Sequence, residues 1–475
     1  MSSIGSTKLI QLLLTFSKKE FQSFVEIVEN PVYNKFKSQI RIAKYLQNNF
    51  SEIEFIEKNQ LEKDCEIKNL NKEMSALLKL AEEYIIKLSL DKNPLKKQEL
   101  KIVELNRRGA NKTFQSAVKT FKEPKENQNV KTNQHLLIDF LVENECDKAF
   151  DRNNQFPYED ALSNKERAID AWYVHSKLKI YSEMIIRERL QDQKFKKTFY
   201  AEVMTFLEKN SDLLKLYPSI QLYLKLIDLL NDDLNEKDYD LFYQSITKNT
   251  EFFPKEEIAN FIQHSINHCI RKINSGYDYL AKLFTAMKFQ VEKGLLVIND
   301  KVHHRSYKNI IEVAIRAKEI DWAIDFLNSY KDFVVSENTE MIYKYNLASI
   351  YLANGQEKKA LKELTFVNFK DVFYQISCKL LYIKIYYALN DILEIESLVH
   401  NFKSYLTRDT FLSVIQKKMY FNFLSYVLQI LNLKNKQTNL LSDEFTIKKE
   451  ALLFEINNEK EIADKYWLTQ TISNL

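Results

Sequence analysis

The stretch that decides the fold is "YNLASIYLANGQEKKALKEL", residues 345–364, which holds one of only five glycines among 475 residues. The spacing typical of a tetratricopeptide hairpin is matched here by Leu347, Ala348, Tyr351, Ala360 and Leu364. The small Ala348 and Ala360 would allow two helices to approach closely. Gly355 falls where the first helix must end, because glycine enters the left-handed region without a side-chain penalty. The stretch therefore predicts a helical hairpin.

The same pattern recurs more faintly 37 residues upstream, at Tyr307, Ile310, Ile311, Ala314, Ala323 and Leu327. A third segment, Lys379–Phe402, has the two-helix form without the small residues. Lys344 stands where the repeat usually has tryptophan, and Val372 where it usually has proline. A spacing of 37 residues, against about 34 for the standard repeat, implies longer helices or joints. We therefore expect tetratricopeptide-like hairpins in series.

Composition favours helices throughout the chain. Five glycines and six prolines are far below the usual share of about 12%, and the tight turns of sheets need these residues. A capping box at Ser17–Glu20 predicts one helix start. The apolar residues of the next helix are expected at Phe36, Ile40, Ala43, Leu46 and Phe50. A further helix is expected over about 69–90.

Breaks in the pattern divide the chain. We predict an all-α protein with an N-terminal helical domain (1–90), a basic helical connector (91–131) and a tetratricopeptide-like α-solenoid of helical hairpins (132–475). Within the connector, two helices are expected, with Leu95, Ile102, Leu105, Phe114, Ala117, Val118 and Phe121 on their buried sides. The polar stretch Asp151–Glu166 is expected to form an exposed loop.

The totals also limit the cellular setting. The net charge is +4, so no strong field draws the chain towards nucleic acid or membrane. Four widely spaced cysteines fit neither a zinc site nor a disulfide framework. No apolar stretch is long enough to span a bilayer, and the N-terminus lacks a secretory signal. We expect a cytoplasmic protein.

Several segments resemble an uncharacterised family of large helical bacterial proteins. They are "FSKKEFQSFVEIVENPVYNK" (16–35), "NHCIRKINSG" (267–276), "IDWAIDFLNSY" (320–330) and "VFYQISCKLLYIKIYYALND" (372–391). The resemblance implies a helical-repeat fold and no known activity. It supplies no catalytic residue.

No pattern in the sequence indicates catalysis, and we expect no catalytic residue, cofactor or metal. His264 and His268 lie four residues apart beside Cys269, a spacing that can hold a metal. No glutamate lies between them, so an ordinary helix surface is the preferred interpretation. No glycine-rich phosphate loop is present.

Two surfaces remain as candidates. Stacked hairpins leave a groove that binds peptides, and the 37-residue register predicts Lys308, Asn346 and Lys379 along it. However, Glu312 and Ile383 stand where a carboxylate-binding clamp has asparagine and arginine. The leading hypothesis is a non-enzymatic scaffold that binds an unidentified protein or peptide through this groove.

The alternative is a nucleic-acid-binding regulator that uses the basic segment 92–131. This segment has eleven Lys or Arg residues against four Glu, a net charge of +7. Lys97, Lys101 and Arg108 align on one predicted helix face and could meet phosphates. Charge runs are usually solvated surface, and no aromatic residue is interleaved for base stacking. We expect binding to DNA or RNA at physiological salt to be weak or absent.

Overall fold

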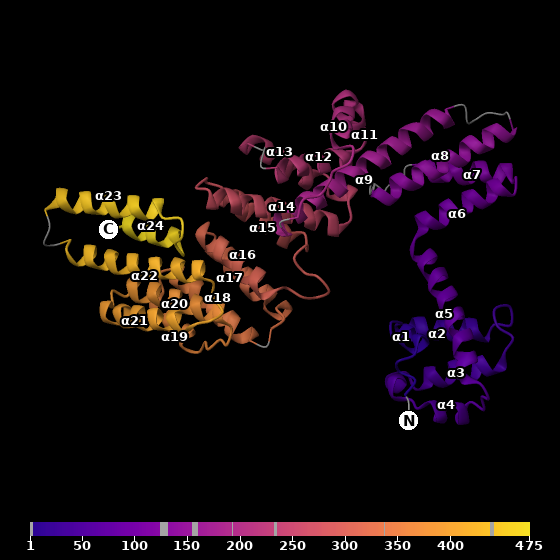
Figure 1. The fold of residues 1–475 in the computed structure, drawn as a ribbon, viewed down its shortest axis with the longest axis horizontal. Helices are drawn as coiled ribbons and strands as arrows, with labels where there is room; N and C mark the ends of the chain where they lie inside the picture. Colours follow the sequence, from indigo (N-terminus) through magenta and orange to yellow (C-terminus); the bar gives the residue numbers. More distant parts are fainter. Residues whose placement is uncertain are drawn as a thin grey trace. The chain divides into compact units, whose positions relative to one another are not determined.

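The structure, a computed structural model, describes residues 3–123, 132–153, 160–191, 193–231, 235–336, 338–437 and 441–475. Over these residues the chain is all-α and contains only three isolated β-bridges, with no strand (Figure 1). Well over half of the chain is α-helix, so the all-helical prediction is confirmed. No helix in this part of the chain combines the length and apolar character needed to cross a bilayer.

The chain divides into two compact units. One comprises residues 1–227 with 251–253, and the other comprises 228–250 with 254–475. The boundary predicted after residue 131 falls on 124–131, which lie outside the described residues.

The first unit begins with a helical bundle. Its helices are α1 (Lys8–Leu13), α2 (Lys18–Glu29), α3 (Lys37–Asn48), the 3-10 helix η1 (Phe50–Phe55), α4 (Lys58–Asp64) and α5 (Leu70–Lys92). The capping box of Ser17 and Glu20 starts α2, as predicted. Phe36 was expected on the apolar side of α3 but is 63% exposed, because it precedes the first helical turn. Ile42 takes the buried position instead.

The rest of this unit consists of longer helices. They are α6 (Pro94–Arg107), α7 (Asn111–Lys122), α8 (Asn133–Asn153), α9 (Ala161–Gln191), α10 (Tyr200–Lys209), α11 (Ser211–Leu216) and the start of α12 (Pro218–Leu230). Ile102 and Phe114 are buried against Ile138 and Val142, so α6 and α7 turn their predicted apolar sides inward. Helices α8 and α9 extend into the two ends of the segment 151–166, which the sequence predicts to be a loop.

That loop prediction is wrong over 151–153 and 161–166, where α8 ends and α9 begins. Residues 154–159 lie outside the described part of the chain. The physical reason is burial, because Ala161 belongs to the apolar core that α6, α7 and α8 share, and Ala168 is also buried. Ala161 within the polar run and Ala168 just after it therefore face the core from α9.

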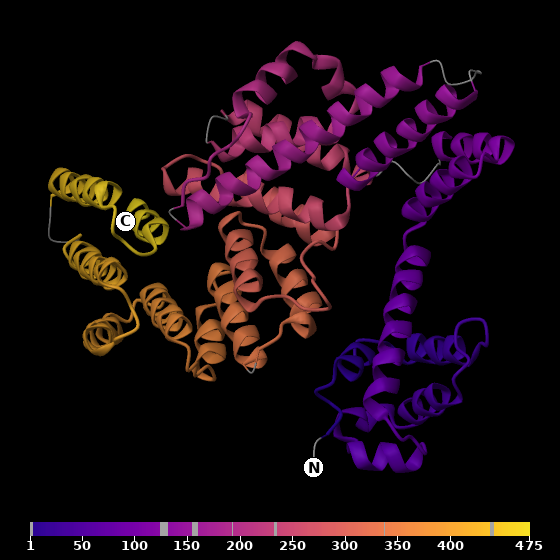
Figure 2. The ribbon, with the colours of Figure 1, turned by 45° about the vertical axis from the view of Figure 1, so that its right-hand side comes forward.

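The second unit is a series of helices. They are α13 (Glu236–Lys248), the 3-10 helix η2 that starts at Thr250 (Thr250–Phe252), α14 (Lys255–Asn274), α15 (Leu280–Glu292), α16 (His304–Arg316), α17 (Ile320–Tyr330), the 3-10 helix η3 (Lys331–Phe333), α18 (Thr339–Ala353), α19 (Glu357–Thr365), α20 (Val372–Ala388), α21 (Ile392–Arg408), α22 (Val414–Asn435), α23 (Ser442–Asn458) and α24 (Lys465–Ser473). From α13 to α24, helices that are consecutive in sequence mostly pack on each other, and α18 also contacts α16 and α20 (Figure 2).

Three hairpins in this unit, α16–α17, α18–α19 and α20–α21, close with the same backbone geometry. Lys318, Gly355 and Asn390 each have φ between +58° and +66°. In each turn the next residue donates its N–H to a carbonyl five residues back, at 2.9 Å. This is the hydrogen bond of a Schellman motif, which satisfies the free carbonyls of the first helix. The role predicted for Gly355 is confirmed.

The helices of the α18–α19 hairpin approach closely, as the sequence predicts. Ala348 and Ala360 are both fully buried where α18 packs on α19. Ala314 and Ala323 are likewise fully buried in the hairpin of α16 and α17. A larger side chain at these positions would push the two helices apart.

Candidate functional site

The residues predicted for a peptide groove lie on α16, α18 and α20, but they do not form one site. Lys308 of α16 reaches α20, where its Nζ donates to Ser377 Oγ at 2.7 Å. The ammonium group also lies over the rings of Tyr345 and Tyr374, 5.3 and 5.8 Å from their centroids. Burial lowers the pKa of Lys308, and Glu312 partly opposes this shift. Lys308 is therefore a half-buried cation that bridges two helices.

The other two predicted groove residues point elsewhere. Asn346 is buried, and its Nδ2 donates to the Ile342 carbonyl oxygen of its own helix at 2.8 Å. Lys379 lies over the rings of Phe402 and Tyr405 of α21, at 5.9 and 5.2 Å. The structure therefore does not bring Lys308, Asn346 and Lys379 together.

The start of α24 covers part of the surface formed by α16 and α20. Arg316 of α16 stacks on the Tyr466 ring, with the guanidinium carbon 4.5 Å from the centroid. Lys384 of α20 forms an ion pair with Asp464, which directly precedes α24. The chain's own side chains therefore occupy cationic positions at which a partner peptide would have to bind.

Exposed apolar side chains gather instead at one end of the hairpins, in the connections after α17, α19 and α21 and in the first turns of α20 and α22. We name this surface the loop edge and define it by Val335 (55% exposed), Phe366 (61%), Phe373 (44%), Phe411 (83%), Val414 (83%) and Ile415 (60%). Most of these side chains contribute little to the core, although they are large and apolar. Large apolar side chains that recur in exposed positions make this end of the hairpins a candidate interaction site.

Contacts between the connections place them at a common end. The N–H of Val302, just before α16, donates to the Phe333 carbonyl oxygen after α17 at 2.8 Å. His304 Nδ1 and the Tyr374 hydroxyl, at the starts of α16 and α20, lie 3.0 Å apart. Because helices of a hairpin are antiparallel, the tight turns at 318, 355 and 390 lie at the opposite end. We name that end the turn edge, defined by these three turns.

Cations flank the apolar residues of the loop edge. Arg305 lies over the exposed Phe373 ring at 5.6 Å, and Lys344 lies over the Phe366 ring at 4.6 Å. Such cation–π contacts are worth about 0.5–1 kcal/mol at exposed sites. The Lys344 ammonium also pairs with Glu340 at 3.7 Å, whereas Arg305 forms no ion pair with a described residue.

Asp371 and Asp409, the carboxylates at the ends of two loop-edge connections, are engaged by the backbone. Asp371 Oδ1 accepts the N–H of Tyr374 at 3.0 Å and caps α20. Asp409 Oδ1 accepts from Phe411 and Leu412 at 3.0 and 2.8 Å. Both carboxylates therefore accept backbone N–H groups, and neither forms an ion pair with a described side chain.

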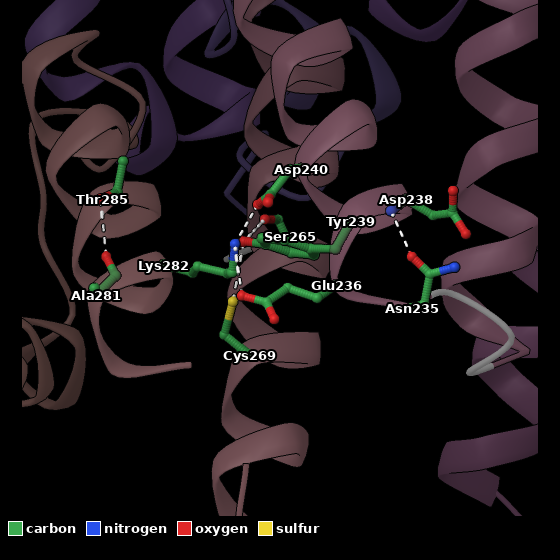
Figure 3. Close-up of polar contacts among 10 residues, drawn as sticks. All are labelled: Asn235, Glu236, Asp238, Tyr239, Asp240, Ser265, Cys269, Ala281, Lys282 and Thr285. Carbon is green, nitrogen blue, oxygen red and sulfur yellow. Dashed lines mark hydrogen bonds and ion pairs between the residues drawn. The ribbon is translucent and has the colours of Figure 1, made fainter. Parts of the chain in front are cut away.

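A polar cluster connects α13, α14 and α15 (Figure 3). The Tyr239 hydroxyl lies 2.8 Å from Ser265 Oγ, and Cys269 Sγ donates to it at 3.0 Å. Beside them, Lys282 forms ion pairs with Asp240 and, at 3.4 Å, with Glu236. Burial raises the pKa of Tyr239, and it raises the pKa of Cys269 to about 11. A hydroxyl and a thiol that stay protonated hold the helices together and are poor nucleophiles.

The sequence favours an ordinary helix surface for His264, His268 and Cys269, and this interpretation is wrong for two of the three. His268 and Cys269 are fully buried, and the His268 ring stacks on Tyr239 with centroids 5.4 Å apart. The aromatic residues of α13 and α15 supply the apolar partner that the α14 sequence does not reveal. Within the described ranges, no group of three or more His, Cys, Asp or Glu side chains could hold a metal ion.

The predicted basic stripe lies on α6, and intrahelical and neighbouring acids counter two of its three charges. Lys97 pairs with Asp91 at 2.7 Å, and Arg108 pairs with Glu104 at 2.6 Å. Hydrogen bonds from Arg107 and then Arg108 lower the pKa of Glu104 to about 2. Lys101 is exposed and forms no ion pair with any described residue. The stripe is therefore less cationic than its sequence implies.

Comparisons with protein-family models, curated proteins and solved structures give no match to this chain. The resemblance to a helical bacterial family and the tetratricopeptide-like pattern remain predictions from the sequence.

None of the predictions from the sequence places a binding surface at the loop edge. A signal for it was present, because the connections after α17, α19 and α21 contain "FVV" (333–335), "FVNF" (366–369) and "FLSVI" (411–415). Joints between helices are usually polar, so bulky apolar residues at their borders indicate either burial or an interaction surface. Only the structure distinguishes Phe369, which is buried, from Phe366 and Phe411, which are exposed.

Proposed function

We propose that this chain is a non-enzymatic scaffold that binds a partner protein through the loop edge of a tetratricopeptide-like array of hairpins. The observation that carries the proposal is the recurrence of large exposed apolar side chains in successive connections at one end of the helices. Stacked hairpins present such repeated positions as one extended surface. Exposing these apolar side chains to water does not stabilise the folded chain, so their exposure requires another explanation.

The character of the buried polar groups supports a binding role over catalysis. All four cysteines are free and buried, and burial raises the pKa of Cys146 and Cys378 to about 12. A catalytic cysteine needs the opposite shift. Hollows of the described surface include an open depression beside Tyr426, Glu455 and Glu461. A shallow hollow gives a small substrate little apolar enclosure.

The site we propose differs from the groove expected from the sequence. Lys308 and Lys379 lie over aromatic rings of neighbouring helices, so we assign them to the contacts between hairpins. The cytoplasmic setting and the family resemblance are part of the same proposal. Nucleic-acid binding through 92–131 is not favoured by a specific observation, because Asp91 and Glu104 counter two of the three stripe cations.

Affinity capture from the host tests the proposal if it compares three tagged full-length proteins. They are the unaltered chain, a loop-edge variant (Phe411→Ser, Val414→Ser, Ile415→Ser) and a control, Leu393→Ser, which changes an apolar residue that is 78% exposed at the turn edge. We expect a partner that is retained by the control and lost by the loop-edge variant. An identical set of captured proteins from all three would contradict the proposal. Nuclease-sensitive capture would favour the nucleic-acid alternative.

A further inference from the structure

We propose that the loop edge recognises an acidic, apolar segment of its partner, an extended chain with a bulky apolar residue at every third position and Asp or Glu between. This inference rests on the proposed function and adds the chemistry of the ligand. Apolar side chains of the segment would cover the loop-edge residues, and its carboxylates would meet the cations beside them.

Charge at the loop edge favours an acidic ligand. Arg305, Lys331, Lys370 and Arg408 are all exposed near the loop edge, and none forms an ion pair with a described residue. Three carboxylates lie in the same region, those of Asp332, Asp371 and Asp409, and the last two accept backbone N–H groups. An approaching carboxylate therefore meets cations that are not engaged in ion pairs with described residues. Electrostatic complementarity of this kind speeds association and selects among ligands.

A cation and an aromatic ring are paired at two positions of the loop edge. At Arg305 over Phe373 and at Lys344 over Phe366, an apolar surface and a positive charge lie side by side. Lys344 also pairs with Glu340 at 3.7 Å, so Arg305 is the cation of the two that has no acidic partner among the described residues. A ligand can satisfy Arg305 and Phe373 together only with a bulky apolar residue next to an acid. A purely acidic segment would leave the rings exposed to water, and a purely apolar one would leave the Arg305 charge without a counter-ion.

The spacing of the helices suits an extended segment. Neighbouring helices pack about 8–10 Å apart, and three residues of a polyproline-type extended chain advance about 9 Å. A segment with an apolar residue at every third position can therefore place one side chain at each successive hairpin. The intervening positions remain available for Asp or Glu.

Single-stranded nucleic acid is the competing ligand, since it also combines negative charge with flat apolar groups. Val335, Val414 and Ile415 favour the peptide, because branched aliphatic side chains offer bases no flat surface for stacking. The rings of Phe366 and Phe373 already hold cations on one side. An oligonucleotide is nevertheless a necessary arm of the test.

The test is fluorescence anisotropy with the full chain and labelled synthetic probes of roughly 12 residues, long enough to span several hairpins. The acidic probe has Leu or Phe at every third position and Glu or Ser between. A second probe replaces each Glu with Gln, a third moves the apolar residues out of register, and a labelled oligo-dT represents single-stranded nucleic acid. Each is titrated at low and at physiological salt.

Two charge-reversal variants give the matched comparison. The loop-edge variant is Arg305→Glu, Lys370→Glu and Arg408→Glu. The control is Lys318→Glu, Lys358→Glu and Lys359→Glu, which makes the same change in net charge near the turn edge. We expect the loop-edge variant to bind the acidic probe at least roughly tenfold more weakly than the unaltered chain, and the control to bind it within about twofold.

Each outcome decides the matter. Tighter binding of the acidic probe than of the Gln probe, lost in the loop-edge variant alone, supports the inference. Equal loss in both variants would mean non-specific charge attraction and would overturn it. Equal affinity for the Gln probe, or tighter loop-edge-dependent binding of oligo-dT, would overturn the acidic-segment assignment. So would failure of the acidic probe to bind, and in that case a partner captured through Phe411, Val414 and Ile415 would still uphold the proposed function.

Discussion

The two ends of the same three hairpins differ in what they require from the sequence. At the turn edge, three residues close each hairpin, and a left-handed residue at 318, 355 or 390 lets the backbone satisfy its own hydrogen bonds. At the loop edge, longer connections lead from one hairpin to the next. Side chains must cap the following helices there, as Asp371 caps α20 and Ser413 caps α22.

The apolar residues follow the same division. The turns (317–319, 354–356 and 389–391) hold mainly polar residues. Leu389 of the third turn is half-buried, and Leu393, in the first turn of α21, is exposed. The connections of the loop edge hold exposed Phe, Val and Ile. Neither capping nor hairpin closure explains these side chains, because capping uses oxygen atoms and backbone N–H groups. Closure of the backbone therefore explains the residues of the turn edge. It does not explain the exposed apolar residues of the loop edge, which we attribute to binding.

The largest expected effect lies outside both edges and sets the pH at which they can be compared. Burial, with Lys179 nearby, lowers the pKa of His175 in α9 from 6.5 to about 4, and neither ring nitrogen has a hydrogen-bond partner among the described residues. The folded state therefore holds a neutral imidazole, whereas the unfolded chain takes up a proton below about pH 6.5. Stability is complete above that pH and falls by about 3 kcal/mol as the pH drops to about 4.

This contribution is measured by urea unfolding at pH 7 and pH 4.5, followed by a signal that reports on the first unit. The unaltered chain is compared with His175→Leu. We expect the variant to lose clearly less stability than the unaltered chain between the two pH values. Carboxylates titrate in both proteins, so only the difference between them is informative. Equal losses would show that His175 is protonated in the folded state. Both edges belong to the second unit and should be compared above pH 6.5.

The next effect tests the interior that joins the two edges. Ala348→Leu and Ala360→Leu should each destabilise the chain by about 1–3 kcal/mol, because each adds a side chain at the contact of α18 with α19. Ala353→Leu is the matched control, since Ala353 lies on α18 and is exposed. Thermal and urea unfolding report the change. If all three variants melted together, the packing of this hairpin would be misassigned, and with it the separation of its ends.

A smaller effect breaks the turn edge selectively. Gly355→Ala should cost about 1 kcal/mol, and this cost isolates backbone strain because an added Cβ would meet no atom within 4 Å. Lys318→Gly should act in the opposite direction and stabilise by up to about 1 kcal/mol, because lysine is strained at φ +63°. Asn390→Gly should change stability less, since asparagine tolerates this conformation. If Gly355→Ala and Lys318→Gly changed the unfolding free energy in the same direction, that result would contradict the shared turn geometry.

The smallest effect is expected at the loop edge. Phe411→Ser and Val414→Ser should each change the unfolding free energy by less than about 0.5 kcal/mol, because both side chains are 83% exposed. Phe369→Ser serves as the contrasting variant in the same region, since Phe369 is buried and its ring stacks on Tyr374. Its loss should cost several-fold more. A large destabilisation by Phe411→Ser would mean that this residue belongs to the core and not to a binding surface.

The fold was predictable where local chemistry decides it. The capping box at Ser17, the left-handed position of Gly355 and the buried sides of α6 and α7 depend on neighbours close in sequence, and all three predictions are confirmed. The prediction that Phe36 is buried is wrong, because this residue precedes the first turn of α3 and does not face the buried side of the helix. The loop expected at 151–166 failed because Ala161 packs on distant helices.

The site was much less predictable. A 37-residue register places Lys308, Asn346 and Lys379 on equivalent helices, but it does not reveal which way each side chain turns. Lys308 reaches α20, where it donates to Ser377, whereas Lys379 lies over an aromatic ring of α21. The loop edge depends on which apolar residues of a connection remain uncovered. That property is set by the packing of whole hairpins and is not encoded in any local motif.

Site-specific photo-crosslinking tests the central claim most directly. A photoreactive phenylalanine analogue is placed at Phe411 of the loop edge in one full-length protein and at Leu393 of the turn edge in another, and each is illuminated in the host. The two positions are similarly exposed, at 83% and 78%. The account predicts a discrete conjugate with a partner protein from position 411 and none from position 393. Equal crosslinking at both positions, or crosslinking at 393 alone, would contradict it.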